Sequence, residues 1–292
     1  AGLVHLRRHL QRRHQHPLAS GILAQSGAVR AMFPGESMTL ASHFAQEVRA
    51  QFERHPLRDG ATVRETDLAH LPPLVATYLR RTGCVDAPVI HNFRVTFDAT
   101  MYRAPGEPLP SDAVQYEFVD DPSRYFFLRT RMLGLPVRVL HEYESGAAHM
   151  QVRVAGLVNL VNERSRALSR AETVTILNDL CIMAPSALID PRFVFAERSE
   201  READARFTHG EHSVTATLVF NADGDLENFI SDDRHALAND GTRWTTPLRN
   251  YTEFEGRRIA TEGDAIWYYE DGHEFQYGTF RISDIRWNVA GF

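Results

Sequence analysis

Polar side chains that could bind an anion or transfer a proton alternate along two neighbouring segments of the chain. Arg129 and Arg131 are separated by one residue, as are His141 and Tyr143. If both segments are strands, a period of two places each pair on one face of its strand. An inward cluster of these groups would bind a carboxylate or perform acid–base chemistry. The alternative is an outward, solvated face that carries cross-strand ion pairs.

A second polar group, Asp232–His235, follows directly after a segment with strand-like alternation. Rigid strand ends commonly position catalytic or ligand-binding side chains. The alternative is structural, because an Asp–Arg pair packed under a helix would fix the register of an otherwise apolar seam. The sequence leaves both interpretations open.

Large aromatic side chains recur through the predicted strands, from Phe93 to Trp287. Core packing explains each of them singly. Together they exceed what a sheet needs in order to pack one layer of helices, and small-molecule sites are mostly apolar with few polar anchors. The aromatic content therefore favours a pocket for an apolar molecule.

Composition and motif content exclude several classes of chemistry. All 32 basic residues are arginines, so no lysine is present to form a Schiff base or a phosphate-binding loop. Cys84 and Cys181 do not lie at metal-ligand or redox spacing, and motifs such as GxSxG and HExxH are absent. We therefore expect neither a metal nor a cofactor. A formal net charge of -6 argues against nucleic acid as a partner.

Three helices are predicted from periodicity and from end signals. Apolar residues at every fourth position predict a helix over residues 38–54, and residues 72–81 begin with prolines and end near a glycine. A third helix is expected to open at Ser169, where Glu172 would complete a capping box, and to stop before Pro185.

Alternating polar and apolar residues predict that most of the remaining chain is a meander of antiparallel strands. The expected strands are residues 92–101, 113–119, 124–132, 137–144, 147–154, 193–196, 205–208, 214–220 and 226–230, with three short ones near 251, 266–269 and 275–282. Residues 125–128 are apolar on both faces and need cover on each side. The predicted fold is α+β, a large curved antiparallel sheet in the form of a half-barrel or open barrel, covered by a few helices.

The N-terminal part differs in composition from the rest. We predict an N-terminal helical segment over residues 1–70, packed on a main domain of residues 71–292. Four arginines lie beside leucines before Pro17, and such a basic arm would contact a membrane surface or a partner unless it is only a solvated helix. The compartment stays open between cytoplasmic and membrane-associated, because a leader or anchor could precede Ala1.

From Leu71 to Trp287 the chain resembles an uncharacterised bacterial family that carries a domain of unknown function, often behind a membrane segment. The segments that carry the resemblance are LPPLVATYLRRTG, RYFFLRTRMLGLPVRVLHEYESG, DLCIMAPSAL, the DRH at residues 233–235, and the W-x-x-P-x-x-x-Y that begins at Trp244. More distantly, it is similar to lipoprotein-carrier half-barrels, whose concave side is plugged by helices and can hold an acyl chain. The resemblance matches Asp179 and Arg234 to an acidic and an arginine position of the family. Ala260 departs from the pattern, since a proline is usual there.

Three functions follow as hypotheses. The first is binding of an apolar or lipid-like small molecule in a cavity enclosed by the sheet. The second is a cofactor-independent isomerase or cyclase, in which His141 or His235 acts as base beside Asp179 or Asp233. The third is scaffolding through the basic arm. The residues predicted to contact a ligand are Arg129, Arg131, His141, Tyr143, Asp179, Arg234, His235, Tyr251 and Trp267.

Overall fold

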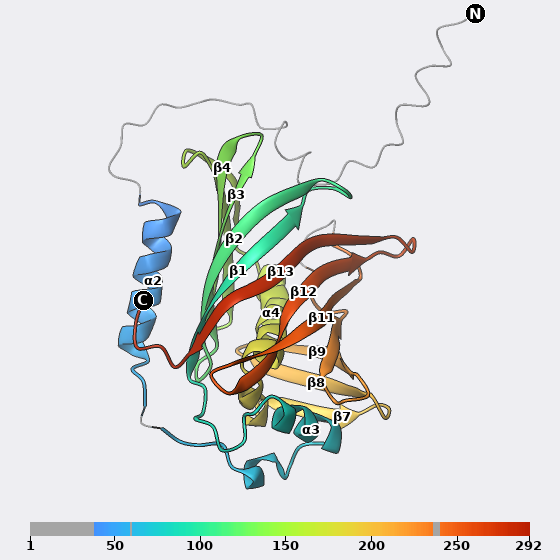
Figure 1. Ribbon diagram of the computed structural model, residues 1–292. Helices are drawn as coiled ribbons and strands as arrows, with labels where there is room; N and C mark the ends of the chain where they lie inside the picture. The colour runs from blue at the N-terminus through green and yellow to red at the C-terminus, as the bar shows by residue number, and fades with distance from the viewer. Residues whose placement is uncertain (1–37, 59, 236–239) are drawn as a thin grey trace, which may run out of the picture. The chain divides into compact units, whose positions relative to one another are not determined.

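Thirteen antiparallel strands form one open sheet in the computed structural model, which describes residues 38–58, 60–235 and 240–292 (Figure 1). From one edge to the other the order is β6, β5, β4, β3, β2, β1, β13, β12, β11, β10, β9, β8 and β7. The strands are β1 (Asn92–Tyr102), β2 (Pro108–Phe118), β3 (Ser123–Met132), β4 (Leu135–Glu144), β5 (Ala147–Val154), β6 (Val158–Glu163), β7 (Phe193–Glu197), β8 (Glu202–His209), β9 (His212–Phe220), β10 (Leu226–Ser231), β11 (Arg243–Phe254), β12 (Arg257–Tyr268) and β13 (Glu274–Trp287). The predicted α+β fold with a curved antiparallel sheet is confirmed.

Period-two patterning is what turns these segments into strands. In β1, Phe93, Val95 and Phe97 are buried on the concave side, and the residues between them are only partly buried. The prediction missed β6 altogether. It also treated the last three strands as short, whereas β11, β12 and β13 have 12, 12 and 14 residues.

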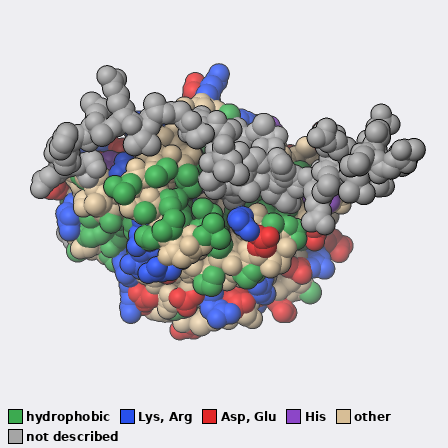
Figure 2. All heavy atoms as spheres, turned by 90° about the horizontal axis from the view of Figure 1, so that it is seen from above, with side chains coloured by type: hydrophobic (Ala, Val, Ile, Leu, Met, Phe, Trp, Pro, Cys, Tyr) green, Lys and Arg blue, Asp and Glu red, His purple; other side chains and the backbone are tan. Residues whose placement is uncertain are grey.

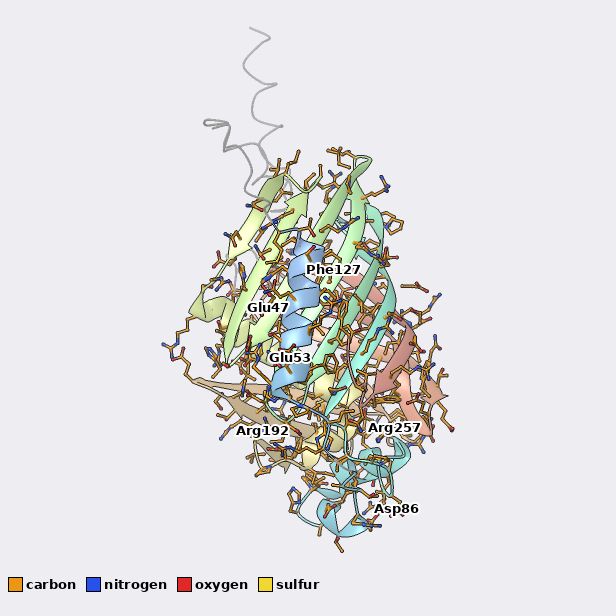
Figure 3. All side chains as sticks on the ribbon, turned by 90° about the vertical axis from the view of Figure 1, so that its left-hand side faces the viewer. Glu47, Glu53, Asp86, Phe127, Arg192 and Arg257 are labelled. Carbon is orange, nitrogen blue, oxygen red and sulfur yellow. The ribbon has the colours of Figure 1, made fainter. Side chains whose placement is uncertain are left out.

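Helices cover both faces of the sheet. The helix α2 (Leu40–Arg54) lies across the outer face of β2, β3 and β4, where Phe44 stacks on Phe127 at 5.3 Å between ring centroids (Figure 3). The helix α4 (Arg166–Met183) lies on the inner face, between the two halves of the sheet (Figure 1). The two-sided cover expected for residues 125–128 is therefore present. Shorter elements are α3 (Pro73–Arg81) and the 3₁₀ turns η1 (Glu65–Leu68) and η2 (Pro185–Ile189).

The predicted start of α4 was wrong. Ser165, not Ser169, is the N-cap, and its Oγ accepts a hydrogen bond from the Leu168 N–H at 3.1 Å. Ser169 lies inside the helix, where its Oγ accepts from the Ala148 N–H on β5. Glu172 is consequently one turn deeper in the helix than a capping box would place it.

The basic arm predicted before Pro17 lies outside the described residues. The described part of the chain belongs to one compact unit that begins at Ser37. The boundary predicted at residue 70 stays a prediction. Among the residues that the structure describes, no helix is both long and apolar enough to cross a bilayer.

Candidate functional site

The helix α4 is buried nearly all round, although it carries polar residues. Apart from Arg170, every residue from Leu168 to Met183 is buried. Glu172 and Asp179 lie about two turns apart on this helix. Buried carboxylates require partners, because an uncompensated charge in a protein interior is costly.

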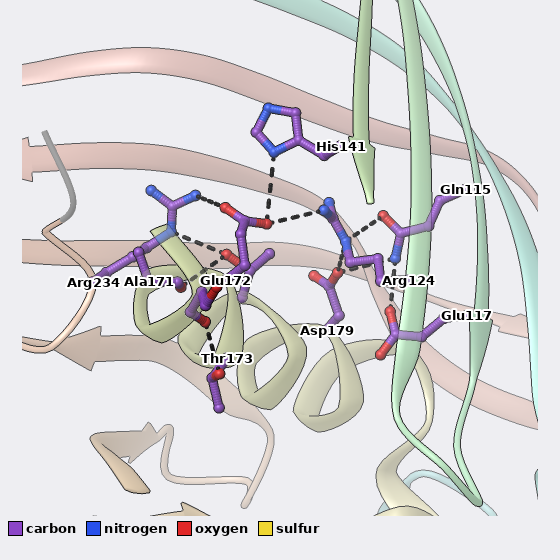
Figure 4. Close-up of polar contacts among 11 residues, drawn as sticks. Gln115, Glu117, Arg124, His141, Ala171, Glu172, Thr173, Asp179 and Arg234 are labelled. Atoms are coloured by element: carbon purple, nitrogen blue, oxygen red, sulfur yellow. Dashed lines mark hydrogen bonds and ion pairs between the residues drawn. The ribbon is translucent and has the colours of Figure 1, made fainter. Parts of the chain in front are cut away.

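Arg124 on β3 partners both carboxylates (Figure 4). Its Nε donates to Asp179 Oδ2 at 2.8 Å, and its Nη1 donates to Glu172 Oε2 at 3.3 Å. The guanidinium also donates to Gln115 Oε1 on β2 at 3.1 Å. One arginine side chain, 9% exposed, thus ties the helix to two strands.

Gln115 extends the cluster to a third carboxyl group. Its Nε2 donates to Asp179 Oδ2 and to Glu117 Oε2, both at 2.9 Å. Burial raises the pKa of Glu117 well above its usual value, and repulsion from Asp179 adds to this effect. Burial also raises the pKa of Asp179, against the attraction of Arg124. Burial therefore favours the neutral form of Glu117, and within the described residues its Oε1 has no hydrogen-bond partner.

Glu172 has two further basic side chains beside it. Arg234 Nη2 lies 3.5 Å from Glu172 Oε1, and His141 Nδ1 lies 3.6 Å from Oε2. Burial alone would raise the pKa of Glu172, but His141, Arg234 and Arg124 together lower it to about 2. Glu172 is therefore an anion at neutral pH.

Arg234 is held between two indole rings. Its guanidinium carbon lies 4.4 Å from the ring centroid of Trp244 and 5.5 Å from that of Trp267, which is cation–π geometry. Its Nε donates to Thr175 Oγ1 on α4 at 3.2 Å. The Trp244 indole N–H donates to the Tyr277 hydroxyl at 3.1 Å, and this hydrogen bond fixes the position of one of the two indole rings.

The structure brings together part of the predicted site. Asp179 lies on α4, and His141, Arg234 and Trp267 lie around this helix in the cluster just described. Tyr143 lies beside it, where its hydroxyl hydrogen-bonds to Thr173 Oγ1 at 2.9 Å.

The other predicted residues lie elsewhere. Arg129 and Arg131 are exposed on the opposite face of β3, and Arg129 pairs with Asp112. His235 is exposed, and Tyr251 donates its hydroxyl hydrogen to the Leu226 carbonyl. Asp232 and Asp233 pair with Arg243 and Arg170, and both side chains of the Asp232–Arg243 pair are more than half exposed. Both interpretations of residues 232–235 stay predictions. Whether any of these residues contacts a ligand stays a prediction.

Sequence reasoning missed the central residues Arg124, Glu172, Gln115 and Glu117. A usable signal existed at Arg124, because it extends the inward row of Phe126 and Leu128 on a strand predicted to be covered on both sides. A charged residue in such a row implies a buried partner.

Two surface depressions of about 400 Å³ each lie away from this cluster. One lies beside α2 and includes Tyr116, Phe127 and Phe292 in its lining. The other lies between α3 and the β9–β10 turn. Within the described ranges, no three His, Cys, Asp or Glu side chains are grouped so as to hold a metal ion.

The fold and the cluster define an α+β protein. Its curved antiparallel sheet surrounds a buried helix, and a network of ionic contacts joins the helix to the sheet. The chain belongs to the family of unknown function DUF6544, whose family model matches residues 61–280. The matched range contains every residue of the cluster, and the family resemblance expected from the sequence is confirmed. No curated protein matches the chain. The more distant similarity to lipoprotein carriers stays a prediction.

Proposed function

We propose that the protein binds an apolar or lipid-like small molecule against the concave face of the sheet, next to α4. The observation that carries the proposal is an apolar row of side chains that meets the buried cluster. Strand register aligns one inward-facing residue from each of five neighbouring strands. The row consists of Phe97, Ala113, Leu128, Val139 and Val152.

The row lies one inward position beyond the polar groups. Val139 is the inward-facing residue next to His141 on β4, and Leu128 is the one next to Phe126 on β3. Figures 1 and 3 show these strands extending past the end of α4. An apolar wall beside a few fixed polar groups is the usual composition of a small-molecule site. Arg234 and His141, whose side chains are 15% and 19% exposed, are the polar groups best placed to orient a ligand.

Native mass spectrometry of the full chain, purified without added ligand, tests the proposal. We expect a co-purifying small molecule, released on denaturation and extractable into organic solvent. A fluorescent fatty acid such as cis-parinaric acid should compete with it. Protein that carries no extractable molecule and binds no apolar probe would remove this function.

A variant pair locates the site. Val139→Gln places an amide in the apolar row at a partly buried position, and we expect about tenfold weaker probe binding from the added desolvation cost. Val194→Gln, at a residue 59% exposed on β7, is the matched control and should bind like the wild type. Equal affinity of both variants would place the ligand elsewhere.

A second candidate is a cofactor-independent enzyme of isomerase or cyclase type that uses the same wall for its substrate. The observation in its favour is the His141–Glu172 pair at 3.6 Å, since an ionised carboxylate can orient and stabilise an imidazole that accepts a proton. The extracted ligand, incubated with the protein, should change its chromatographic retention with the wild type and not with His141→Gln. The exposed His235→Gln variant should act as the wild type. If the ligand is unchanged in all three samples, the enzyme hypothesis is refuted and only the binding function remains.

A further inference from the structure

Among the described residues, the most exposed large hydrophobic side chains lie on two hairpin turns. Leu133 in the β3–β4 turn and Leu157 in the β5–β6 turn are each 88% exposed. Leu135 and Val158 beside them are 51% and 55% exposed. Four of the eight exposed large hydrophobics in the described part of the chain therefore lie on these two turns.

The two turns are neighbours in space. β4 and β5 pair up to Val137 and Val154, and the Ala155 N–H donates to the Pro136 carbonyl at 2.8 Å. The four hydrophobic side chains thus form one group at one end of the sheet, which we call the leucine tip (Leu133, Leu135, Leu157 and Val158). Figure 2 looks down on this end of the molecule and shows hydrophobic side chains gathered on it, with arginines nearby.

Folding does not explain a leucine at the β3–β4 turn. Leu133 has φ 51° and is followed by Gly134 at φ 80°, the left-handed pair of a two-residue hairpin. Asn, Asp or Gly is preferred at the first of these positions, because the left-handed conformation brings a Cβ close to a carbonyl oxygen. Gly has no Cβ, and the short polar side chains of Asn and Asp form local hydrogen bonds. Leu133 is both strained and exposed to solvent, so we infer that it serves an interaction with another molecule and not the stability of the fold.

The strands behind the tip are basic. Residues 129–141 and 149–162 contain four arginines and no Asp or Glu. Register places Arg129 opposite Arg138, and Arg138 opposite Arg153, in one row on the outer face, where Asp112 on β2 pairs with Arg129 but not with the other two. Like charges directly opposite on neighbouring strands destabilise a sheet. An anionic partner would offset that repulsion.

We propose that the leucine tip and the arginine row behind it dock on the surface of an anionic lipid bilayer. Exposed leucines at the ends of hairpins insert into the interfacial region, where apolar burial stabilises the contact. Arginines just behind them lie at headgroup depth and pair with lipid phosphates. This docking surface goes beyond the proposed ligand site, and its test needs no ligand.

The test is sedimentation of the full chain with vesicles of phosphatidylglycerol and phosphatidylcholine, and with vesicles of phosphatidylcholine alone. We expect binding to the anionic vesicles that weakens as salt rises above about 0.1 M. The double variant Leu133→Asn/Leu157→Asn should bind about tenfold more weakly. Asn suits the left-handed position of Leu133, and Leu157 is 88% exposed, so this variant should keep its fold, which circular dichroism checks.

Control variants distinguish membrane binding through the leucine tip from nonspecific hydrophobic adsorption and from binding through the basic arm. Val194→Asn removes an exposed hydrophobic on β7 and should bind as the wild type. Arg138→Gln/Arg153→Gln should bind more weakly and with less salt dependence, whereas the exposed Arg206→Gln should change neither. Failure of the wild type to bind, or equal binding by the leucine variant, would overturn the proposal.

A spectroscopic measurement reports on the tip directly. Cys84 and Cys181 are buried, so Leu133→Cys can be labelled selectively with an environment-sensitive dye. The dye emission should shift to the blue on addition of anionic vesicles. Sedimentation without a blue shift would assign membrane binding to another part of the chain and refute docking through the tip.

Discussion

Arg124 illustrates how much of this interior depends on one side chain. The cluster sets the guanidinium groups of Arg124 and Arg234 beside the carboxyl groups of Glu172 and Asp179. These carboxyl groups keep their guanidinium partners only while both arginines are present. A balanced buried network is tolerated, but the loss of one member leaves another uncompensated.

Replacing Arg124 by Met should therefore lower the free energy of unfolding by about 3–5 kcal/mol. Met preserves much of the volume, so the loss would come mainly from the stranded carboxylates. Urea unfolding monitored by tryptophan fluorescence measures it. The control is Arg129→Met on the same strand but on the exposed face, where loss of the pair with Asp112 should cost less than about 1 kcal/mol. Similar losses in the two variants would contradict the assigned role of Arg124.

These central residues were difficult to predict because their partners are far away in the chain. Arg124 is 48 and 55 residues from Glu172 and Asp179. Local sequence patterns identify the buried face of an element, but they do not identify which distant charged residues form an ion pair. Glu172 was actively misassigned, since a serine followed three residues later by a glutamate also describes an ordinary helix interior. His141 was named because its residue type suits acid–base chemistry. Arg234 was named because it lies in the polar group at residues 232–235 and matches an arginine position of the family.

At the scale of elements, the start of α4 positions the cluster. Ser165 caps the helix, Ser169 binds the β5 backbone, and Thr173 binds Tyr143. These contacts set the rotation of the helix, and rotation decides that Glu172 faces Arg124. The N-cap is therefore both a local and a tertiary determinant.

Ser165→Ala should destabilise the protein by about 1 kcal/mol and speed amide exchange at Leu168, because the cap acceptor is lost. Ser165→Asp keeps an acceptor and adds a favourable charge at the helix N-terminus, so it should behave as the wild type or better. Hydrogen exchange resolved by mass spectrometry measures both. Unchanged exchange at the first turn in Ser165→Ala would show that this cap contributes little.

Element types were more predictable than element lengths. Hydrophobic alternation identified twelve of the thirteen strands in the described residues, because one face of each is buried. It underestimated β11–β13 because twisted, half-exposed strands alternate weakly towards their ends. The turns at Leu133 and Ala155 also lack the Asn-Gly or Asp-Gly signal, although both adopt left-handed geometry before a glycine.

At the scale of the whole sheet, its two halves approach each other around α4. The β4–β5 turn at Gly146 lies close to the turn at Gly210, where a Cβ on Gly146 would be 3.5 Å from the Gly210 Cα. Arg192, ahead of β7, donates to the carbonyls of Val119 and Asp120 in the β2–β3 turn. These contacts join elements that sequence reasoning treated as distant, since a local pattern carries no information on curvature.

His209 is the titratable group at this junction and predicts a pH dependence. Its Nδ1 hydrogen-bonds to the Tyr143 hydroxyl at 2.8 Å, and Nε2 lies 3.4 Å from Asp121. Burial lowers the pKa of His209 below its usual 6.5, although Asp121 opposes the shift. The unfolded chain therefore binds a proton at higher pH than the folded chain does. This contribution to stability is complete above the unfolded pKa and is lost as pH falls below it towards the folded pKa.

The wild type should accordingly lose stability as the pH is lowered from 7.5 through 6.5 to 5.5, and His209→Gln should lose less. Glutamine retains a hydrogen-bonding group for Tyr143 but does not titrate. Urea unfolding at the three pH values gives the slopes. His235→Gln, at an exposed position, should reproduce the wild-type slope. If His209→Gln shows the full wild-type slope, the acid sensitivity arises away from the junction, and the contact between the two halves does not depend on a neutral histidine.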